Sequence, residues 1–203
     1  MNQAFEILNQ QIAYNGFFKL ETYQFRHTLF KGGWSEPVTR ELFRRNNCVA
    51  VLLYDPDLDR IVLIEQFRVG AMLHQRNAWL LEIVAGGIEF GETAEEVAYR
   101  EAKEEANCDI QQLKLICEFY TSPGGASERL SLFCGKIDSR NVGGIYGLAE
   151  ENEDIKVTTV TVNQAWELLM QGRIESAIPI IALQWLALNH AQLKAEWSTL
   201  TNE

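Results

Sequence analysis

The chain has little positive charge. Its 203 residues carry 18 Lys and Arg against 28 Asp and Glu, which gives a formal net charge of −10 at pH 7. Because nucleic-acid backbones bind to basic patches, this balance argues against a nucleic acid as the main partner. An acidic protein still binds a diphosphate when metal ions mediate the contact, so a small phosphate-bearing ligand stays open.

Cysteine, histidine and long apolar runs are also scarce. The four cysteines show no CxxC spacing, and the three histidines are scattered, so nothing supports a metal cluster of these residues or a nucleophilic triad. We expect Cys48, Cys108, Cys117 and Cys134 to be reduced, mostly buried thiols. The apolar segments are too short to span a bilayer, and the first residues, MNQAFEILNQQ, do not resemble a signal peptide. These features predict a cytoplasmic protein without a membrane partner.

The pattern of apolar residues predicts strands interleaved with a few helices. With 203 residues and 47% hydrophobic content, the chain can form one domain with a sizeable core, alone or with a small appendage. Strand-like segments lie at residues 17–30, 38–43, 48–54, 61–67, 79–84, 113–120, 129–137 and 155–162. A helix capped by Asn163 is expected through Met170, and a last one from Ile178 to about Trp197. This order favours an α/β fold with a mixed sheet covered on both faces.

The most informative stretch runs from Gly86 to Cys108 and reads GGIEFGETAEEVAYREAKEEANC. Glu101, Glu104 and Glu105 have the i, i+3, i+4 spacing that places three side chains on one face of a helix. Small apolar residues share that face, which therefore points inward. Carboxylates packed together cost free energy unless a cation neutralises them, and Mg²⁺ does so through oxygen ligands. The stretch predicts a metal-binding helix.

The residues around this helix predict where it begins and ends. Thr93 and Glu96 have the spacing of a capping box at its start. Glycines precede it, at positions 86, 87 and 91, so the backbone there can approach a ligand closely. Asn107 tolerates the left-handed conformation that ends many helices.

The same stretch resembles the box of the Nudix hydrolases over its whole length. The resemblance rests on the pattern Gly86-x5-Glu92-x7-Arg100-Glu101-Ala102-x-Glu104-Glu105-x-Asn107-Cys108. Asn107 stands where the family has its final glycine, and it is the mildest replacement for a left-handed residue. The resemblance implies the Nudix α/β/α sandwich and a hydrolase that acts on a phosphoanhydride.

The resemblance also implies roles for the residues of the box. Glu101 and Glu105, one turn apart, are the expected prime metal ligands, Glu104 is a supporting ligand with a catalytic role, and the Ala85 carbonyl completes the shell. Arg100 is expected to act in catalysis by orienting a glutamate. Glu92 is expected to have a structural role, and Gly87 is expected to contact the substrate.

Two loops outside the box resemble those of bacterial ADP-ribose pyrophosphatases within this family. The segment SPGG-x-SER starts at Ser122, and it implies substrate contacts by Ser122, Gly124 and Glu128; alone, it is also an ordinary turn. The segment GLAEENEDI starts at Gly147 and resembles a mobile loop that supplies the catalytic base. By position Glu151 is the expected base, ahead of its acidic neighbours, and Glu153 an additional metal contact. A solvated acidic loop is the alternative.

The N-terminal segment resembles a unit that this subfamily exchanges between subunits of a homodimer. We therefore expect an N-terminal β unit at residues 1–46 and a Nudix domain at 47–203. Substrate contacts are implied for Phe17 or Phe18 on the adenine, for Arg40 with Glu41 on the nucleotide, and for Arg68 on the diphosphate. The alternatives are two core phenylalanines and a surface arginine.

Together these features predict a Mg²⁺-dependent enzyme that hydrolyses ADP-ribose to AMP and ribose 5-phosphate, with Mn²⁺ as an alternative cation. One alternative is a pyrophosphatase of GDP-mannose or another nucleoside diphosphate-sugar, which shares the box and an SPGG-type loop. The other is a regulatory domain that binds ADP-ribose without cleaving it. Such domains usually lose glutamates of the box, whereas Glu101, Glu104 and Glu105 are all present here.

Overall fold

The protein is described by a computed structural model that covers residues 3–74 and 77–198. Its internal contacts divide the chain into two compact units. The first unit holds the residues up to Asn47 together with Phe119–Leu130, and the second holds Cys48–Glu118 and the residues from Ser131 onward. The hairpin that contains the SPGG segment therefore belongs to the first unit, which the sequence pattern alone did not predict.

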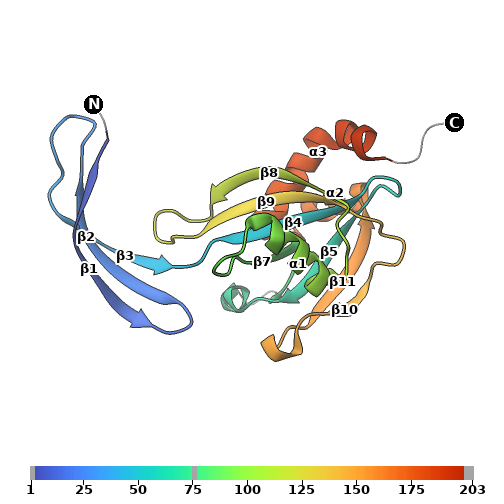
Figure 1. Ribbon diagram of the computed structural model, residues 1–203, viewed down its shortest axis with the longest axis horizontal. Helices are drawn as coiled ribbons and strands as arrows, with labels where there is room; N and C mark the ends of the chain where they lie inside the picture. Colours follow the sequence, from blue (N-terminus) through green and yellow to red (C-terminus); the bar gives the residue numbers. More distant parts are fainter. Residues whose placement is uncertain (1–2, 75–76, 199–203) are drawn as a thin grey trace. The chain divides into compact units, whose positions relative to one another are not determined.

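The first unit is built on a three-stranded antiparallel sheet in the order β1-β2-β3 (Figure 1, blue). Its strands are β1 (Phe5–Asn15), β2 (Lys19–His27) and β3 (Val38–Arg44). The sequence predicted the second and third strands but missed β1, whose residues are exposed along its whole length. Because no face of β1 is buried, its sequence lacks the alternation of apolar and polar residues that marks a half-buried strand.

The second unit is built on a larger sheet in the order β10-β11-β5-β4-β9-β8, with β6 paired to β5 and β7 to β4 (Figure 1). The strands are β4 (Cys48–Asp55), β5 (Arg60–Phe67), β6 (Trp79–Glu82), β7 (Val84–Gly87), β8 (Gln112–Tyr120), β9 (Arg129–Lys136), β10 (Gly144–Tyr146) and β11 (Ile155–Thr161). The segment predicted as one strand at 79–84 is divided, because β6 pairs with β5 and β7 pairs with β4. A short 3₁₀-helix, η1 (Val69–His74), precedes β6.

Helices cover both faces of this sheet, so the predicted α/β/α sandwich is confirmed. On one face, α1 (Ala94–Ala106) packs Val97, Ala98 and Ala102 into a core cluster with Val51 of β4 and Ile64 of β5. The alternate residues of β4 and β5 point to the other face and are also buried. There the sheet contacts α2 (Val162–Met170) and α3 (Ala177–Trp197). The fold thus places the acidic helix directly against β4, β5 and β7.

On the second face α3 spans the predicted residues to within one position, whereas the cap of α2 differs from the prediction. The cap of α2 is Thr161 and not Asn163, because Thr161 forms a capping box with Gln164. On α3, His190 and Lys194 both contact the carboxylate of Asp59, which lies in the turn between β4 and β5. None of the described helices has the length and apolar character needed to cross a membrane.

Candidate active site

The acidic helix begins and ends at the predicted residues. The Glu96 amide donates to the Thr93 hydroxyl at 3.2 Å, and the Thr93 amide donates to the Glu96 carboxylate at 2.8 Å. Asn107 ends the helix with φ = 50°, in the left-handed region, so it replaces glycine there as expected. The local sequence therefore fixes the rotation of α1 and the direction in which its carboxylates point.

The carboxylates share the buried face of α1. Glu105 is only 3% exposed, and the side chain of Glu101 is 12% exposed, whereas that of Glu104 is 29% exposed. Glu105 Oε2 accepts a hydrogen bond of 2.9 Å from the Ala85 amide, which ties α1 to β7. The predicted metal residues Ala85, Glu101 and Glu105 therefore lie together.

Burial makes these carboxylates resist ionisation. The pKa of Glu105 is raised to about 8, chiefly by burial and also by the charges of Glu101 and Glu153, against the Ala85 hydrogen bond and the charge of Arg68. Burial also raises the pKa of Glu101, against the Arg100 guanidinium. A cation at this place would restore the charged forms, so the electrostatics favour binding a positive ion.

Arg100 holds the remaining carboxylates in place. Its Nη1 donates to Glu101 at 2.8 Å and to Glu104 at 3.0 Å. Its Nε donates to Glu92 at 3.0 Å, and its Nη2 donates to the Gly87 carbonyl at 3.3 Å. Arg100 thus bonds to the acidic helix and to the loop before it, which is the arrangement expected of a residue that orients glutamates.

Gly86 leaves the space that Glu101 fills. A Cβ at position 86 would lie 1.7 Å from Glu101 Oε1, far inside van der Waals contact. The absence of a side chain at this position therefore determines where the Glu101 carboxylate lies.

Gly86→Ala is accordingly expected to displace the Glu101 carboxylate and lower kcat by about 100-fold or more, because Glu101 is a predicted metal ligand and a misplaced ligand would no longer orient the reacting groups. Steady-state kinetics of the purified variant measure this effect. Gly70→Ala is the matched control, because a Cβ there would have no neighbour within 4 Å. Equal kcat values for Gly86→Ala and Gly70→Ala would contradict the role given to the space beside Glu101.

A salt bridge with a buried carboxylate and a partly exposed arginine joins β6 to the end of β5. Arg68, directly after β5, donates to Glu82 of β6 at 2.6 Å, and Glu82 is 9% exposed. Sequence reasoning singled out Arg68 but missed Glu82. A carboxylate inside the apolar run WLLEIVA, directly before the box, was the signal that could have identified it.

The loop from Gly147 to Asp154 brings a further carboxylate toward the helix. Gly147 has φ = 109°, and a Cβ there would lie 2.6 Å from Glu153 Cβ. Glu153 accepts a hydrogen bond of 3.1 Å from the Leu148 amide. Its charge raises the pKa of both Glu101 and Glu105. Glu151 ends the short 3₁₀-helix η2 (Ala149–Glu151), but its side chain lies outside the described part of the structure.

A sequence model of the NUDIX domain matches residues 44–196, which include the acidic helix, the Arg68–Glu82 pair and the Gly147 loop. The chain belongs to the NUDIX domain family. The Nudix resemblance of the box is therefore confirmed.

Several proteins of similar length match this chain over nearly its whole length. The ADP-ribose pyrophosphatase of Haemophilus influenzae (strain ATCC 51907 / DSM 11121 / KW20 / Rd) is 48% identical over 96% of this chain and 91% of its own length. That of Escherichia coli (strain K12) is 48% identical over 95% and 92%. A GDP-mannose pyrophosphatase of Shigella flexneri serotype 5b (strain 8401) is 28% identical over 94% and 98%. A crystal structure of an ADP compounds hydrolase superposes with a TM-score of 0.69 at 21% identity, over 95% of this chain and 96% of that one, which supports the fold.

NUDIX proteins generally use a divalent metal, and the residues of this site suit one. The donors on α1 and β7 are carboxylate and carbonyl oxygens, which hard cations prefer, and they lie where burial disfavours bare negative charge. Within residues 3–74 and 77–198, no three acidic, His or Cys side chains already enclose a metal position. Instead, Glu101 and Glu104 turn toward Arg100.

The predicted nucleotide contacts lie in the first unit. Phe17 is 96% exposed, whereas Phe18 is 38% exposed and packs on Phe43 at a centroid distance of 4.9 Å, with the Arg45 guanidinium 5.2 Å from its ring. Phe17 therefore keeps open ring faces, and Phe18 is mostly committed to packing. Of the two candidates, Phe17 is the better placed to stack on a base.

Arg40, Glu41 and Gly124 line one pocket of this unit. The pocket has a volume of about 320 Å³ and combines these residues with apolar side chains of all three strands. The remaining lining residues are Phe5, Ile7, Tyr23, Phe25, Leu42 and Pro123. The structure thus brings the Arg-Glu pair of β3 beside the SPGG segment, although they are more than 80 residues apart in the chain.

Ser122 and Glu128 have structural partners within the first unit. The Ser122 carbonyl accepts hydrogen bonds from the amides of Gly125 and Ala126. Glu128, which is 6% exposed, accepts from Thr121 at 2.9 Å and pairs with Arg45 at 3.0 Å. These bonds shape the turn, so any contact of Glu128 with a ligand would share its carboxylate with Arg45.

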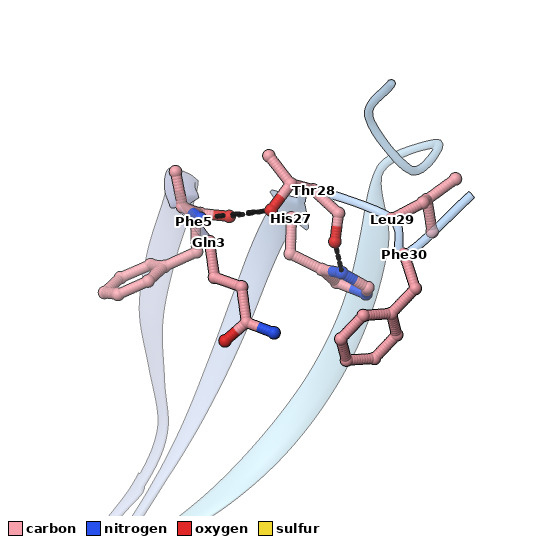
Figure 2. A pocket seen from close by; sticks show the side chains of 7 residues that line it. Gln3, Phe5, His27, Thr28, Leu29 and Phe30 are labelled. Carbon is pink, nitrogen blue, oxygen red and sulfur yellow. Dashed lines mark hydrogen bonds between the residues drawn. The ribbon is translucent and has the colours of Figure 1, made fainter. Parts of the chain in front are cut away.

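A second pocket of about 320 Å³ contains none of the predicted site residues. Figure 2 shows its lining from Gln3 to Phe5 and from His27 to Phe30, with the Thr28 hydroxyl accepting from the Ala4 amide at 3.1 Å. The Thr28 carbonyl lies 3.0 Å from His27 Nδ1. Its lining contains no carboxylate and no Arg or Lys, so the pocket lacks the carboxylate oxygen ligands and the cationic side chains that the predicted reaction needs.

Proposed function

We propose that this protein is a Mg²⁺-dependent hydrolase that cleaves the diphosphate of ADP-ribose to AMP and ribose 5-phosphate. The observation that carries the proposal is the 48% identity to two ADP-ribose pyrophosphatases over at least 95% of the chain. The buried carboxylates of α1 support a metal-dependent reaction. Mn²⁺ would satisfy the same oxygen ligands.

In the proposed reaction the chain would provide ligands for the cation, an arginine for the phosphates and a general base. Glu101, Glu105 and the Ala85 carbonyl would hold the cation, with Glu104 and Glu153 in support. When bound, the cation would neutralise phosphate charge and lower the pKa of a water molecule. Arg68 would bind phosphate oxygens through its guanidinium. Glu151 would accept the proton of the attacking water, from a loop that closes over the substrate.

The nucleotide would be held by the first unit. Phe17 would stack on the adenine, while Arg40 and Glu41 would contact the nucleotide from their pocket with Gly124. Additional contacts are proposed for Gly87, Ser122 and Glu128, and Phe18 would support Phe17 through their edge-to-face contact. The 47–203 segment would form the catalytic domain.

We also propose that the protein is a homodimer that exchanges the unit at residues 1–46. Support comes from β1, where apolar side chains are open to solvent: Phe5 is 74%, Ile12 58% and Tyr14 65% exposed. A second copy would cover such a surface. A cytoplasmic location and the lack of nucleic-acid or membrane partners stay predictions.

The test of the function is product analysis with ADP-ribose, ADP-glucose, ADP-mannose and GDP-mannose, with Mg²⁺ and with EDTA. We expect AMP to form fastest from ADP-ribose and only when metal is present. Faster cleavage of GDP-mannose, the substrate named for the 28% identical relative, would replace the proposed substrate but keep the reaction. Binding of ADP-ribose without cleavage of any compound would favour a regulatory domain.

A further inference from the structure

The side chain of Gln66 on β5 carries a buried hydrogen-bond donor without an acceptor. Gln66 is 7% exposed, and its Nε2 has no hydrogen-bond partner among the residues that the structure describes. Buried polar groups are nearly always paired, because an unpaired donor loses its bonds to water and gains nothing in return. A donor in this state reduces the stability of the folded protein, so it calls for a reason in function.

The strand register places this side chain on the face of the sheet that α1 covers. Side chains alternate along a strand, so Gln66 points to the same side as Val62 and Ile64. Both of those residues pack in the core cluster with Val97, Ala98 and Ala102 of α1. Along this face of β5, Gln66 therefore follows the apolar residues Val62 and Ile64 and is the first polar residue after them.

Charged groups lie near Gln66, and one of them, Arg68, has a role in the proposed reaction. Arg68 follows two residues later and binds Glu82, which lies opposite Ile64 in the ladder. The charge of Arg68 acts on the buried carboxylate of Glu105. Gln66 thus lies on β5 between Arg68 and Ile64, the residue opposite Glu82, yet its Nε2 donates to none of the described residues.

We propose that Gln66 is a substrate-binding residue, whose Nε2 donates a hydrogen bond to an oxygen of the diphosphate that Arg68 binds. The assignment rests on the proposed function for the class of ligand, a nucleoside diphosphate compound. Phosphate oxygens are strong acceptors, and an uncharged donor adds a directed hydrogen bond to the point charge of an arginine. Because the donor has no partner in the free protein, its hydrogen bond would be gained only when the ligand binds.

Gln66→Met tests the proposal, since Met has a similar shape and no donor. In the free protein the variant is expected to raise the Tm by about 2–4 °C, because it removes an unpaired buried donor. The same variant is expected to weaken binding of α,β-methylene ADP-ribose, ADP and inorganic pyrophosphate by about tenfold or more, measured by calorimetry with Mg²⁺. A side chain with a merely structural role would change stability and affinity in the same direction.

Two further variants complete the test. Gln112→Met makes the same change at an exposed position of β8, the strand at the end of the sheet, and is expected to leave both Tm and Kd unchanged. Gln66→Glu keeps the shape but points a carboxylate at the diphosphate, so it is expected to weaken binding more than Gln66→Met. If Gln66→Met does not fold, Gln66→Glu decides by the same Kd values.

The outcomes separate this proposal from the proposed function. Unchanged Kd values of Gln66→Met for all three ligands would overturn the role of Gln66. If its Tm rises at the same time, the amide donates to a water molecule or to nothing, and not to the ligand. If the wild type binds ADP and pyrophosphate but does not cleave ADP-ribose, the proposed substrate fails, and the Kd ratio still decides on Gln66. A wild type that binds no diphosphate compound would overturn both.

Discussion

Glu105→Gln is expected to lower kcat by about 100-fold or more while the protein stays folded. Gln has nearly the same shape as Glu, and its oxygen can still accept the hydrogen bond of the Ala85 amide. What the variant loses is a negative charge at a position that is 3% exposed. A cation binds more weakly to a neutral amide, so the Kd for Mg²⁺ or Mn²⁺ is expected to rise together with the loss of kcat.

The stability of the metal-free protein should depend on pH through the same carboxyl group. Burial raises the pKa of Glu105 from 4.5 to about 8 in the folded protein. Between these pH values the folded state keeps a proton that the unfolded state has released. The free energy of unfolding therefore falls as pH rises from about 4.5 to about 8, by up to about 1.4 kcal/mol per pH unit. Glu105→Gln should lack this decline.

Urea unfolding in EDTA at several pH values measures this difference. Glu95→Gln is the matched control, because Glu95 lies on the same helix but is exposed. The control is expected to keep wild-type kcat and the wild-type dependence on pH. A Glu105→Gln variant with the same kcat and the same pH dependence as the control would mean that Glu105 is neither a metal ligand nor held in its neutral form.

Local signals in the sequence were enough to predict the acidic helix. The capping residues Thr93 and Glu96 are three positions apart, and Asn107 acts on its own backbone conformation, so each signal is readable without knowledge of the fold. The helical period then assigns Glu101 and Glu105 to the buried face. Element types within the α/β sandwich were predictable for the same reason, because the strands of the core alternate or run continuously in apolar residues.

Contacts between distant segments were not predictable in this way. The Arg68–Glu82 pair and the unpaired amide of Gln66 depend on which strands become neighbours, and β6 pairs with β5 only because the chain turns through η1. The strand β1 was missed because all its residues are exposed, so no buried face imposes a period on its sequence. Pairing partners and exposed strands are set by the whole fold, not by local sequence.

Glu151→Gln is expected to lower kcat by about 10²–10⁴-fold, with a change of less than about threefold in the Kd for Mn²⁺. The reason is that a general base acts on the water proton and not on the cation. In the loop around it, Gly147 adopts a left-handed conformation and the Glu153 carboxylate accepts a hydrogen bond from the Leu148 amide. Loss of a base also removes the fall of kcat at low pH that its protonation causes.

The neighbouring carboxylates provide the comparison that makes this assignment decisive. Glu150→Gln changes an exposed residue of the same 3₁₀-helix and is expected to keep wild-type kcat. Glu153→Gln removes a charge that acts on Glu101 and Glu105, so it should weaken Mn²⁺ binding along with kcat. Removal of the base is thus expected to lower kcat alone, whereas removal of a metal contact is expected to lower kcat and raise the Kd for Mn²⁺. If Glu151→Gln keeps wild-type turnover and Glu150→Gln does not, the base is Glu150, and the position inferred from the GLAEENEDI segment is wrong by one residue.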